Sequence, residues 1–193
     1  PVTNHALHGQ EDRQKTARII QAKGVIGNTA RVIASARRVG MPVMYTAHVH
    51  KADDSDWLLR ITDERSPWLT TKPRTRMVEG TPGVDIIDEL KPAPGDHVVY
   101  KHRRNAFYGT NLEIILRSWG IETIIITGYC SYGCVAHTIQ GAEERDLNVI
   151  ILSDCCAAPD PEVEECYFQE IFPITARVRT SDELVAAMST AGG

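Results

Sequence analysis

The feature that most constrains the fold of this chain is a regular alternation of strand-like and helix-like segments. Short apolar runs at residues 97–100, 123–127 and 149–152 are typical of buried strands, and segments with helical spacing follow them. Such alternation predicts a parallel sheet covered by helices on both faces. The helices are expected at residues 110–119, 134–145, 161–171 and 181–188, the last one capped by residues 181–183, and a final short strand is expected at residues 176–178.

The earlier part of the chain is less regular. Apolar residues recur at helical spacing from Val25 to Ala36, and residues 42–46 then predict another buried strand. Residues 48–82 are rich in Asp, Arg, Thr and Pro and have no clear period. Long irregular segments in compact domains often act as lids or interface arms. Residues 84–90 predict a short strand or helix, and residues 1–23 are polar and weakly patterned.

Length and composition bound the class of protein. The 193 residues predict a single domain, residues 1–193. The chain carries 21 basic and 25 acidic residues, a net charge of −4, which argues against a nucleic-acid partner. Its longest apolar run, residues 123–128, is too short to span a membrane, and residues 1–5 do not resemble a signal peptide. Five cysteines, two of them adjacent, predict reduced thiols in a cytoplasmic protein.

Two reactive side chains fall where ligands bind in folds of this kind, beyond the carboxyl ends of parallel strands. Lys101 ends one predicted strand, and Cys134 lies near the first turn of the helix that follows another. A helix N-terminus and a neighbouring cation both favour the thiolate, which is the reactive form of cysteine. The sequence therefore predicts Cys134 as a nucleophile with Lys101 as its activating partner. The alternative is that Cys134 is a small buried apolar residue.

Other chemistries have weaker support. Cys130 is a rival nucleophile, because residues 128–132 partly match the glycine–x–nucleophile–x–glycine turn, although Tyr132 replaces the second glycine. His48 and His50 point to the same face of a strand and could hold a metal, but no third ligand is specified. We therefore expect a partly solvated histidine pair, no metal and no cofactor. No phosphatase loop, dinucleotide fingerprint or Walker-type loop is present.

Several motifs, taken in order, resemble those of the isochorismatase-like hydrolases. The resemblance runs from about Gly24 to Met188 and is specific because the motifs occur at the expected separations. The motifs are residues 101–107, in which Asn105 replaces the usual Ser, together with Thr110-Asn111-Leu112, residues 120–128, Cys134-Val135 and residues 153–158.

The resemblance implies a three-layer α/β/α, Rossmann-like fold around a mostly parallel six-stranded sheet. It also implies an Asp–Lys–Cys triad in which the thiolate attacks the carbonyl carbon of an amide, ureide or carbamoyl group. A thioester acyl-enzyme then forms and is hydrolysed by water. The backbone N–H groups of Cys130 and Cys134 would form the oxyanion hole, next to a cis peptide bond near Tyr129-Cys130.

One departure from the family pattern is serious. The family's Asp follows an apolar first strand in a motif of the form Asp-x-Gln. Asp12-Arg13-Gln14 has these letters, but residues 6–11 are too polar for a central strand. We therefore expect Asp12 to be a solvated residue at a helix start. The first strand and the catalytic Asp are expected upstream of Pro1 in the native protein.

The thiol of Cys134 favours C–N hydrolysis over the ether cleavage of true isochorismatases, and residues 48–50 lack the Asp of the nicotinamidase metal motif. The resemblance thus implies a cysteine amidohydrolase of the N-carbamoylsarcosine amidase or ureidoacrylate amidohydrolase branch, acting on a small-molecule substrate as a homodimer or homotetramer. The alternatives are an isochorismatase-type ether hydrolase, a nicotinamidase, or a non-catalytic binding or scaffold protein. Candidate substrate contacts are Phe107, Tyr129, Tyr132 and Arg103, with core packing or solvation as their alternatives.

Overall fold

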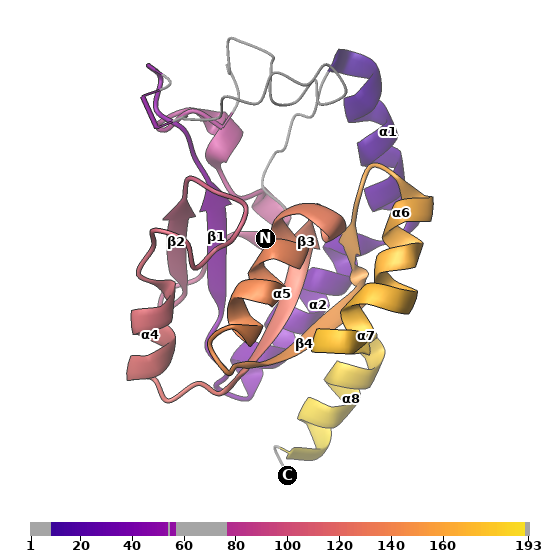
Figure 1. Ribbon diagram of the computed structural model, residues 1–193. Helices are drawn as coiled ribbons and strands as arrows, with labels where there is room; N and C mark the ends of the chain where they lie inside the picture. The colour runs from indigo at the N-terminus through magenta and orange to yellow at the C-terminus, as the bar shows by residue number, and fades with distance from the viewer. Residues whose placement is uncertain (1–8, 54, 57–76, 192–193) are drawn as a thin grey trace.

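The computed structural model describes residues 9–53, 55–56 and 77–191, which form an α/β fold with parallel sheets (Figure 1). The described residues contain five strands in two sheets, where a single six-stranded sheet was expected. The first sheet has the order β1-β2 and the second β3-β4-β5, and every pairing is parallel. The strands are β1 (Met44–His48), β2 (His97–Lys101), β3 (Thr123–Tyr129), β4 (Asn148–Ala157) and β5 (Arg177–Arg179).

The expected helices are present, and the structure adds two that were not expected, α1, whose sequence is mostly polar, and the short α7. Asp12 lies within α1, so the letters Asp-x-Gln do not mark the end of a strand. Among the described residues, none of the helices combines the length and apolar character needed to cross a bilayer. The helices are α1 (Gly9–Ala22), α2 (Val25–Arg38), α4 (Leu112–Ser118), α5 (Ala136–Glu143), α6 (Pro161–Cys166), α7 (Phe172–Thr175) and α8 (Ser181–Ala191), with short turns η1 (Pro82–Val84), η2 (Asp88–Leu90), η3 (Ser131–Val135) and η4 (Tyr167–Ile171).

Strand β4 shows why the strand sequences are continuously apolar. Successive residues of a strand point to opposite faces. Ile151 and Cys156 pack with residues of α4, α5 and α7, whereas Leu152 and Cys155 pack with residues of α2 and α8. All four side chains are fully buried. Helices therefore cover both faces of this sheet, and both faces need apolar residues.

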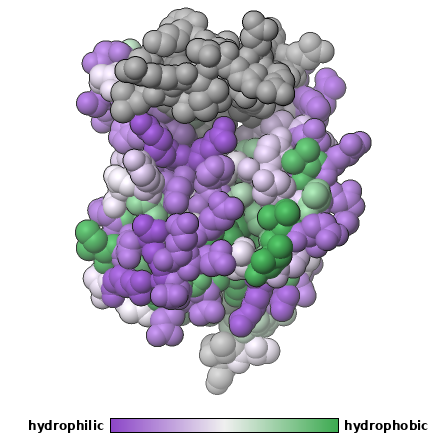
Figure 2. Space-filling model, viewed as in Figure 1, coloured by the Kyte–Doolittle hydropathy of each residue, from purple (hydrophilic) through white to green (hydrophobic). Residues whose placement is uncertain are grey.

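A cavity of about 510 Å³ separates the two sheets. Strand β1 is the end strand of one sheet and β3 is the end strand of the other, and both contribute to its walls. The two strands run in the same direction in Figure 1. Most of the wall is apolar, and Lys101 and Cys134 belong to the lining as well. On the face shown in Figure 2 hydrophilic residues predominate, and hydrophobic ones show in several small patches.

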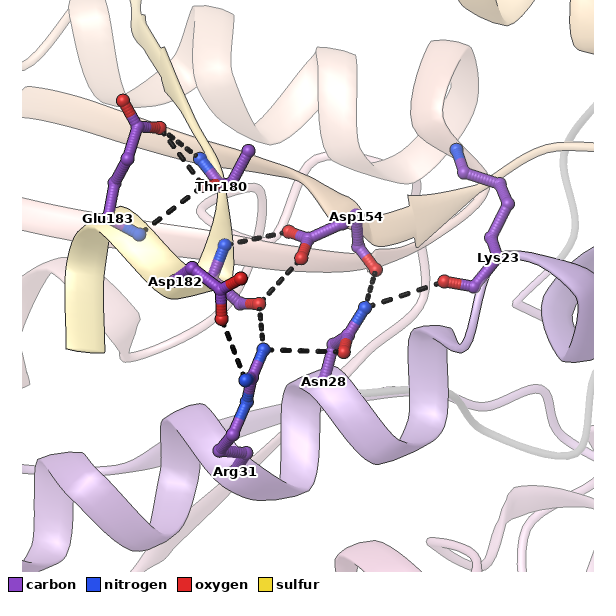
Figure 3. A network of polar contacts seen from close by, with 8 residues as sticks. Lys23, Asn28, Arg31, Asp154, Thr180, Asp182 and Glu183 are labelled. Carbon is purple, nitrogen blue, oxygen red and sulfur yellow. Dashed lines mark hydrogen bonds and ion pairs between the residues drawn. The ribbon is translucent and has the colours of Figure 1, made fainter. Parts of the chain in front are cut away.

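Asp154 joins strand β4 to α2 and α8 (Figure 3). Its carboxylate accepts a hydrogen bond from the backbone N–H of Ser181 at 2.8 Å and another from the Ser181 hydroxyl at 2.5 Å. Asn28 of α2 donates to the Asp154 carbonyl at 3.1 Å, and Arg31 donates to the Ser181 hydroxyl at 2.6 Å. The Asp in the motif at residues 153–158 thus holds the start of a helix.

The cap of α8 is one residue earlier than expected. The backbone N–H of Glu183 donates to the Thr180 hydroxyl at 3.3 Å, and the Glu183 carboxylate accepts from the Thr180 N–H at 2.7 Å. This reciprocal pair is a capping box with Thr180 at the N-cap. Ser181 is instead fully buried and bound to Asp154.

Asp154→Ala should lower the free energy of unfolding by about 2–4 kcal/mol, because the N–H and hydroxyl of buried Ser181 lose their acceptor. Urea denaturation followed by circular dichroism measures the change. Asp182→Ala is the matched control, since Asp182 is exposed and pairs with Arg31 at the surface. Its removal should cost less than about 1 kcal/mol. Equal losses in the two variants would contradict the role given to Asp154.

Candidate active site

The segment between β3 and α5 brings Cys134 to the cavity. A cis peptide bond links Tyr129 to Cys130, as the resemblance implied. Turn η3 follows, and Gly133 within it has the non-helical angles φ −108° and ψ −106°. A Cβ atom at position 133 would lie 3.4 Å from the Cys130 Sγ, so Gly133 packs directly beside the neighbouring thiol. Cys134 itself is half-buried and lines the cavity.

Lys101 reaches the same place from the end of β2. Its side chain is nearly inaccessible, with the residue only 3% exposed. The Nζ atom donates to the carbonyl oxygens of Arg103 at 2.9 Å and Arg104 at 3.0 Å. Burial lowers the pKa of Lys101, and a hydrogen bond and charge attraction to Cys134 oppose this shift. The structure therefore brings together the two residues predicted as nucleophile and activating cation.

The rival thiol lies in a different environment. Burial, and after it the neighbouring Cys134, raises the pKa of Cys130 to about 12. Cys130 is therefore protonated at neutral pH, whereas Cys134 interacts electrostatically with the Lys101 ammonium. Because the thiolate is the nucleophilic form, this contrast favours Cys134.

Thr138 is a site residue that sequence reasoning missed. It lies one helical turn after Cys134 and donates its hydroxyl hydrogen to the Cys134 carbonyl at 2.7 Å. The same hydroxyl accepts from the backbone N–H of Ala106 at 3.1 Å. A helical Thr often binds the carbonyl four residues earlier, so the spacing alone carried no functional signal. Only the fold shows that Thr138 ties the nucleophile segment to the segment that follows Lys101.

Two of the predicted substrate contacts lie beside the site. Tyr129 lines the cavity, but it is buried, and its hydroxyl lies 3.3 Å from the Thr16 hydroxyl. Burial raises the pKa of Tyr129 above its usual range. Arg103 is half-buried and donates to the His102 carbonyl at 2.7 Å.

The other two predicted contacts have packing roles. Phe107 is 4% exposed in the core, and its ring centroid lies 4.9 Å from the guanidinium carbon of Arg145. The ring of half-buried Tyr132 lies 6.0 Å from that of Tyr167, and burial raises the pKa of Tyr132 to about 12. Phe107 thus packs in the hydrophobic core, which was the alternative to its predicted contact with substrate.

The histidine pair is not solvated as expected. His48 and His50 are both buried, with ring centroids 4.7 Å apart. Asp56 has one carboxylate oxygen 3.0 Å from Nδ1 of His50 and 2.8 Å from Nδ1 of His102. Despite burial, hydrogen bonds from His102, the Lys51 amide and His50 hold the pKa of Asp56 well below its usual range. This contact ties the segment after β1 to the residue next to Lys101. Within the part of the chain that the structure describes, no group of three His, Cys, Asp or Glu side chains could hold a metal ion.

Asn105, which stands where the resembling family has Ser, packs closely on α5. Its Oδ1 accepts from the backbone N–H of Phe107 at 2.9 Å, which fixes the turn after Lys101. A Cβ atom at Gly141 would lie 2.4 Å from Nδ2 and 2.7 Å from Oδ1 of Asn105. A side chain at position 141 would therefore force the amide group of Asn105 to shift.

Gly141→Ala should lower the free energy of unfolding by about 1–3 kcal/mol through overpacking, although Ala is the better helix former. Adding Asn105→Ser, which shortens the obstructing side chain, should recover most of the loss. Denaturant unfolding of both single variants and the double variant gives the coupling energy. If Gly141→Ala costs the same with Ser at position 105, the contact with Asn105 is not the cause.

Known proteins are similar to this chain over most of its length. The family model described as "Isochorismatase domain" matches residues 10–183. N-carbamoylsarcosine amidase of Arthrobacter sp is 32% identical over 161 residues, which are 83% of this chain and 60% of the relative. Ureidoacrylate amidohydrolase RutB of Methylobacterium radiotolerans is 31% identical over 150 residues, 72% of this chain and 57% of the relative. The chain thus spans about three-fifths of the length of these two relatives.

A solved structure is also similar over nearly the whole chain. The crystal structure of N-carbamoylsarcosine amidase from Thermoplasma acidophilum aligns with a TM-score of 0.71 and 32% sequence identity. The alignment covers 94% of this chain and 92% of that one.

Proposed function

The chain belongs to the isochorismatase family of hydrolases, and from this premise we propose that it hydrolyses a C–N bond of a small amide, ureide or N-carbamoyl substrate. The observation that carries the proposal is that Lys101 and Cys134 both line one cavity, where they attract each other electrostatically. The names of the amidase and amidohydrolase relatives support the choice of a C–N bond.

In the proposed reaction the Cys134 sulfur forms a bond to the substrate carbonyl carbon. The resulting oxyanion accepts hydrogen bonds from the backbone N–H groups of Cys130 and Cys134, which stabilise it. The C–N bond then breaks, and the nitrogen leaves with a proton. Water attacks the thioester, which releases the acid and restores the thiolate. The Lys101 ammonium stabilises both the thiolate and the negative charge that develops.

The proton for the leaving nitrogen needs a general acid. We propose that a sixth strand fills the cavity between the sheets, parallel to β1 and β3, and carries an Asp at its carboxyl end. Support comes from the facing end strands, whose backbone groups can pair with an inserted strand, and from the apolar walls. One continuous six-stranded sheet in a three-layer arrangement would result.

A synthetic peptide tests the sixth strand. It has five Val, Ile or Leu residues followed by Asp-Gly-Gln, with lysines at its amino end to keep it in solution. Binding should slow hydrogen exchange at backbone amides of β1 and β3 by 10-fold or more, an order of magnitude typical of newly protected strands. The Asp peptide should also raise the rate of substrate hydrolysis. The same peptide with Asn in place of Asp should protect these amides but leave the rate of hydrolysis unchanged. A peptide with a central Pro cannot pair and is the control. Protection only at the outer edges of β2 or β5 would contradict the proposal.

The acyl-enzyme tests the proposed function itself. Release of ammonia or amine is measured with N-carbamoyl amino acids, ureides and simple amides. Reactions with a hydrolysed substrate are then quenched in acid, digested and analysed by mass spectrometry. The acyl group is expected on the peptide that contains Cys134. An acyl group on Cys130, or turnover by a Cys134→Ala variant, would be incompatible with the mechanism.

A further inference from the structure

We propose that Glu164 is a positioning residue that holds the Ser131 hydroxyl and thereby fixes the segment presenting the Cys130 and Cys134 amides to the substrate. The inference deepens the proposed function and rests on it. Glu164 lies in α6, far along the chain from η3, and the motifs in the sequence gave no reason to connect the two.

The first step is the burial of Ser131. This residue follows the cis peptide bond at Cys130 and is 0% exposed. Its hydroxyl donates to one carboxylate oxygen of Glu164. Because Gly133 breaks the helical geometry within the same turn, regular helix hydrogen bonds alone do not set its shape. The Ser131 side chain is thus an anchor inside the segment that carries the nucleophile.

The second step is the burial of the anchor's partner. Glu164 is 4% exposed, and a buried carboxylate is costly unless it is paired and hydrogen-bonded. Its other oxygen pairs with the Lys23 ammonium at 2.9 Å. The Lys23 ammonium also lies 5.7 Å from the ring centroid of Phe168. Lys23, between α1 and α2, therefore compensates the charge that Glu164 brings to the nucleophile segment.

A second contact joins the same two elements. The backbone of Asp160, the N-cap of α6, opposes the effect of burial on the pKa of the Tyr132 hydroxyl. Ser131 and Tyr132, consecutive residues of η3, therefore both interact with α6 or with its N-cap. Helix α6 therefore supports turn η3, and Glu164 is the charged residue of α6 that contacts it.

The position of the charge also suits the chemistry. Glu164 is among the groups that raise the pKa of Cys130, after burial and Cys134. Lys101, at the end of β2, interacts electrostatically with Cys134. A carboxylate near Cys130 and an ammonium near Cys134 give the two thiols different surroundings.

The test compares two reactions of Cys134 that differ in their need for the backbone amides. Acylation by p-nitrophenyl acetate passes through an oxyanion, whereas alkylation by iodoacetamide does not. Both are measured in a Cys166→Ser background, because Cys166 is exposed and would otherwise react. The variants are Ser131→Ala, Glu164→Ala and Glu164→Gln, the last of which keeps an oxygen acceptor for Ser131. Glu165→Gln, at the exposed neighbouring position, is the matched control.

Ser131→Ala and Glu164→Ala should slow acylation by roughly 10- to 100-fold, while alkylation of Cys134 stays within about threefold. Glu164→Gln should recover part of the acylation rate, and Glu165→Gln should match the parent. Equal losses in acylation and alkylation would overturn the positioning role, as would unchanged acylation in Ser131→Ala. If the parent protein itself is not acylated at Cys134, the proposed function fails, and the inference fails with it.

Discussion

Cys134→Ala is expected to abolish hydrolysis, with kcat lowered by roughly 10³- to 10⁶-fold, the range typical of a removed nucleophile. The covalent route requires the Cys134 sulfur, and no other thiol in the site is placed to substitute for it. Cys130 is protonated at neutral pH because burial raises its pKa to about 12. The measurement is the steady-state release of ammonia or amine from the substrate that the wild type hydrolyses.

Cys130→Ala is the matched control for this variant. Position 130 is proposed to contribute its backbone N–H, which the substitution retains. The variant should therefore keep kcat within about 10-fold of the wild type, a small loss beside that of a nucleophile. If Cys130→Ala were the inactive variant and Cys134→Ala the active one, the assignment of the two thiols would be reversed.

Lys101→Met should lower kcat by about 10²- to 10⁴-fold, because a neutral side chain of similar length cannot stabilise the thiolate or the developing negative charge. The variant also leaves the carbonyls of Arg103 and Arg104 without their donor. Circular dichroism and thermal unfolding therefore need to accompany the kinetics. A folded variant with wild-type kcat would remove Lys101 from the mechanism.

The pH dependence gives an independent test of Lys101. Burial lowers the pKa of Lys101 from the ordinary lysine value of 10.5. The ammonium is present below this lowered pKa and is lost as the pH rises through it. Activity should therefore fall on the alkaline side at a pH below that expected for an ordinary lysine. Lys101→Arg keeps its charge to higher pH and should move this limb upward. If the alkaline limb is the same in Lys101→Met and Lys101→Arg as in the wild type, it reports the titration of another group.

The placing of Lys101 and Cys134 on one cavity was predictable from the sequence, because both residues lie near the carboxyl ends of predicted strands. Lys101 and Cys134 follow apolar runs, and parallel strands place their carboxyl ends at one edge, so the sequence predicted that the two side chains meet. Asp12 and α1 show the limit, since a mostly polar helix carries little periodic signal. The burial of His50 depends on Asp56 and His102, a partnership between separate segments that spacing does not reveal. Thr138 and Glu164 were missed for the same reason.

The adjacent thiols of Cys155 and Cys156 in β4 can be used to follow how the folded protein comes apart. Cys155 faces α2 and α8, and Cys156 faces the side of α4, α5 and α7. Both are fully buried, and burial raises the pKa of each to about 12, so neither thiol reacts while the protein is folded. A pulse of thiol reagent during partial denaturation would mark Cys155 when one helical layer detaches and Cys156 when the other does. Neighbouring positions in the chain thus record separately the order in which the two sides come apart.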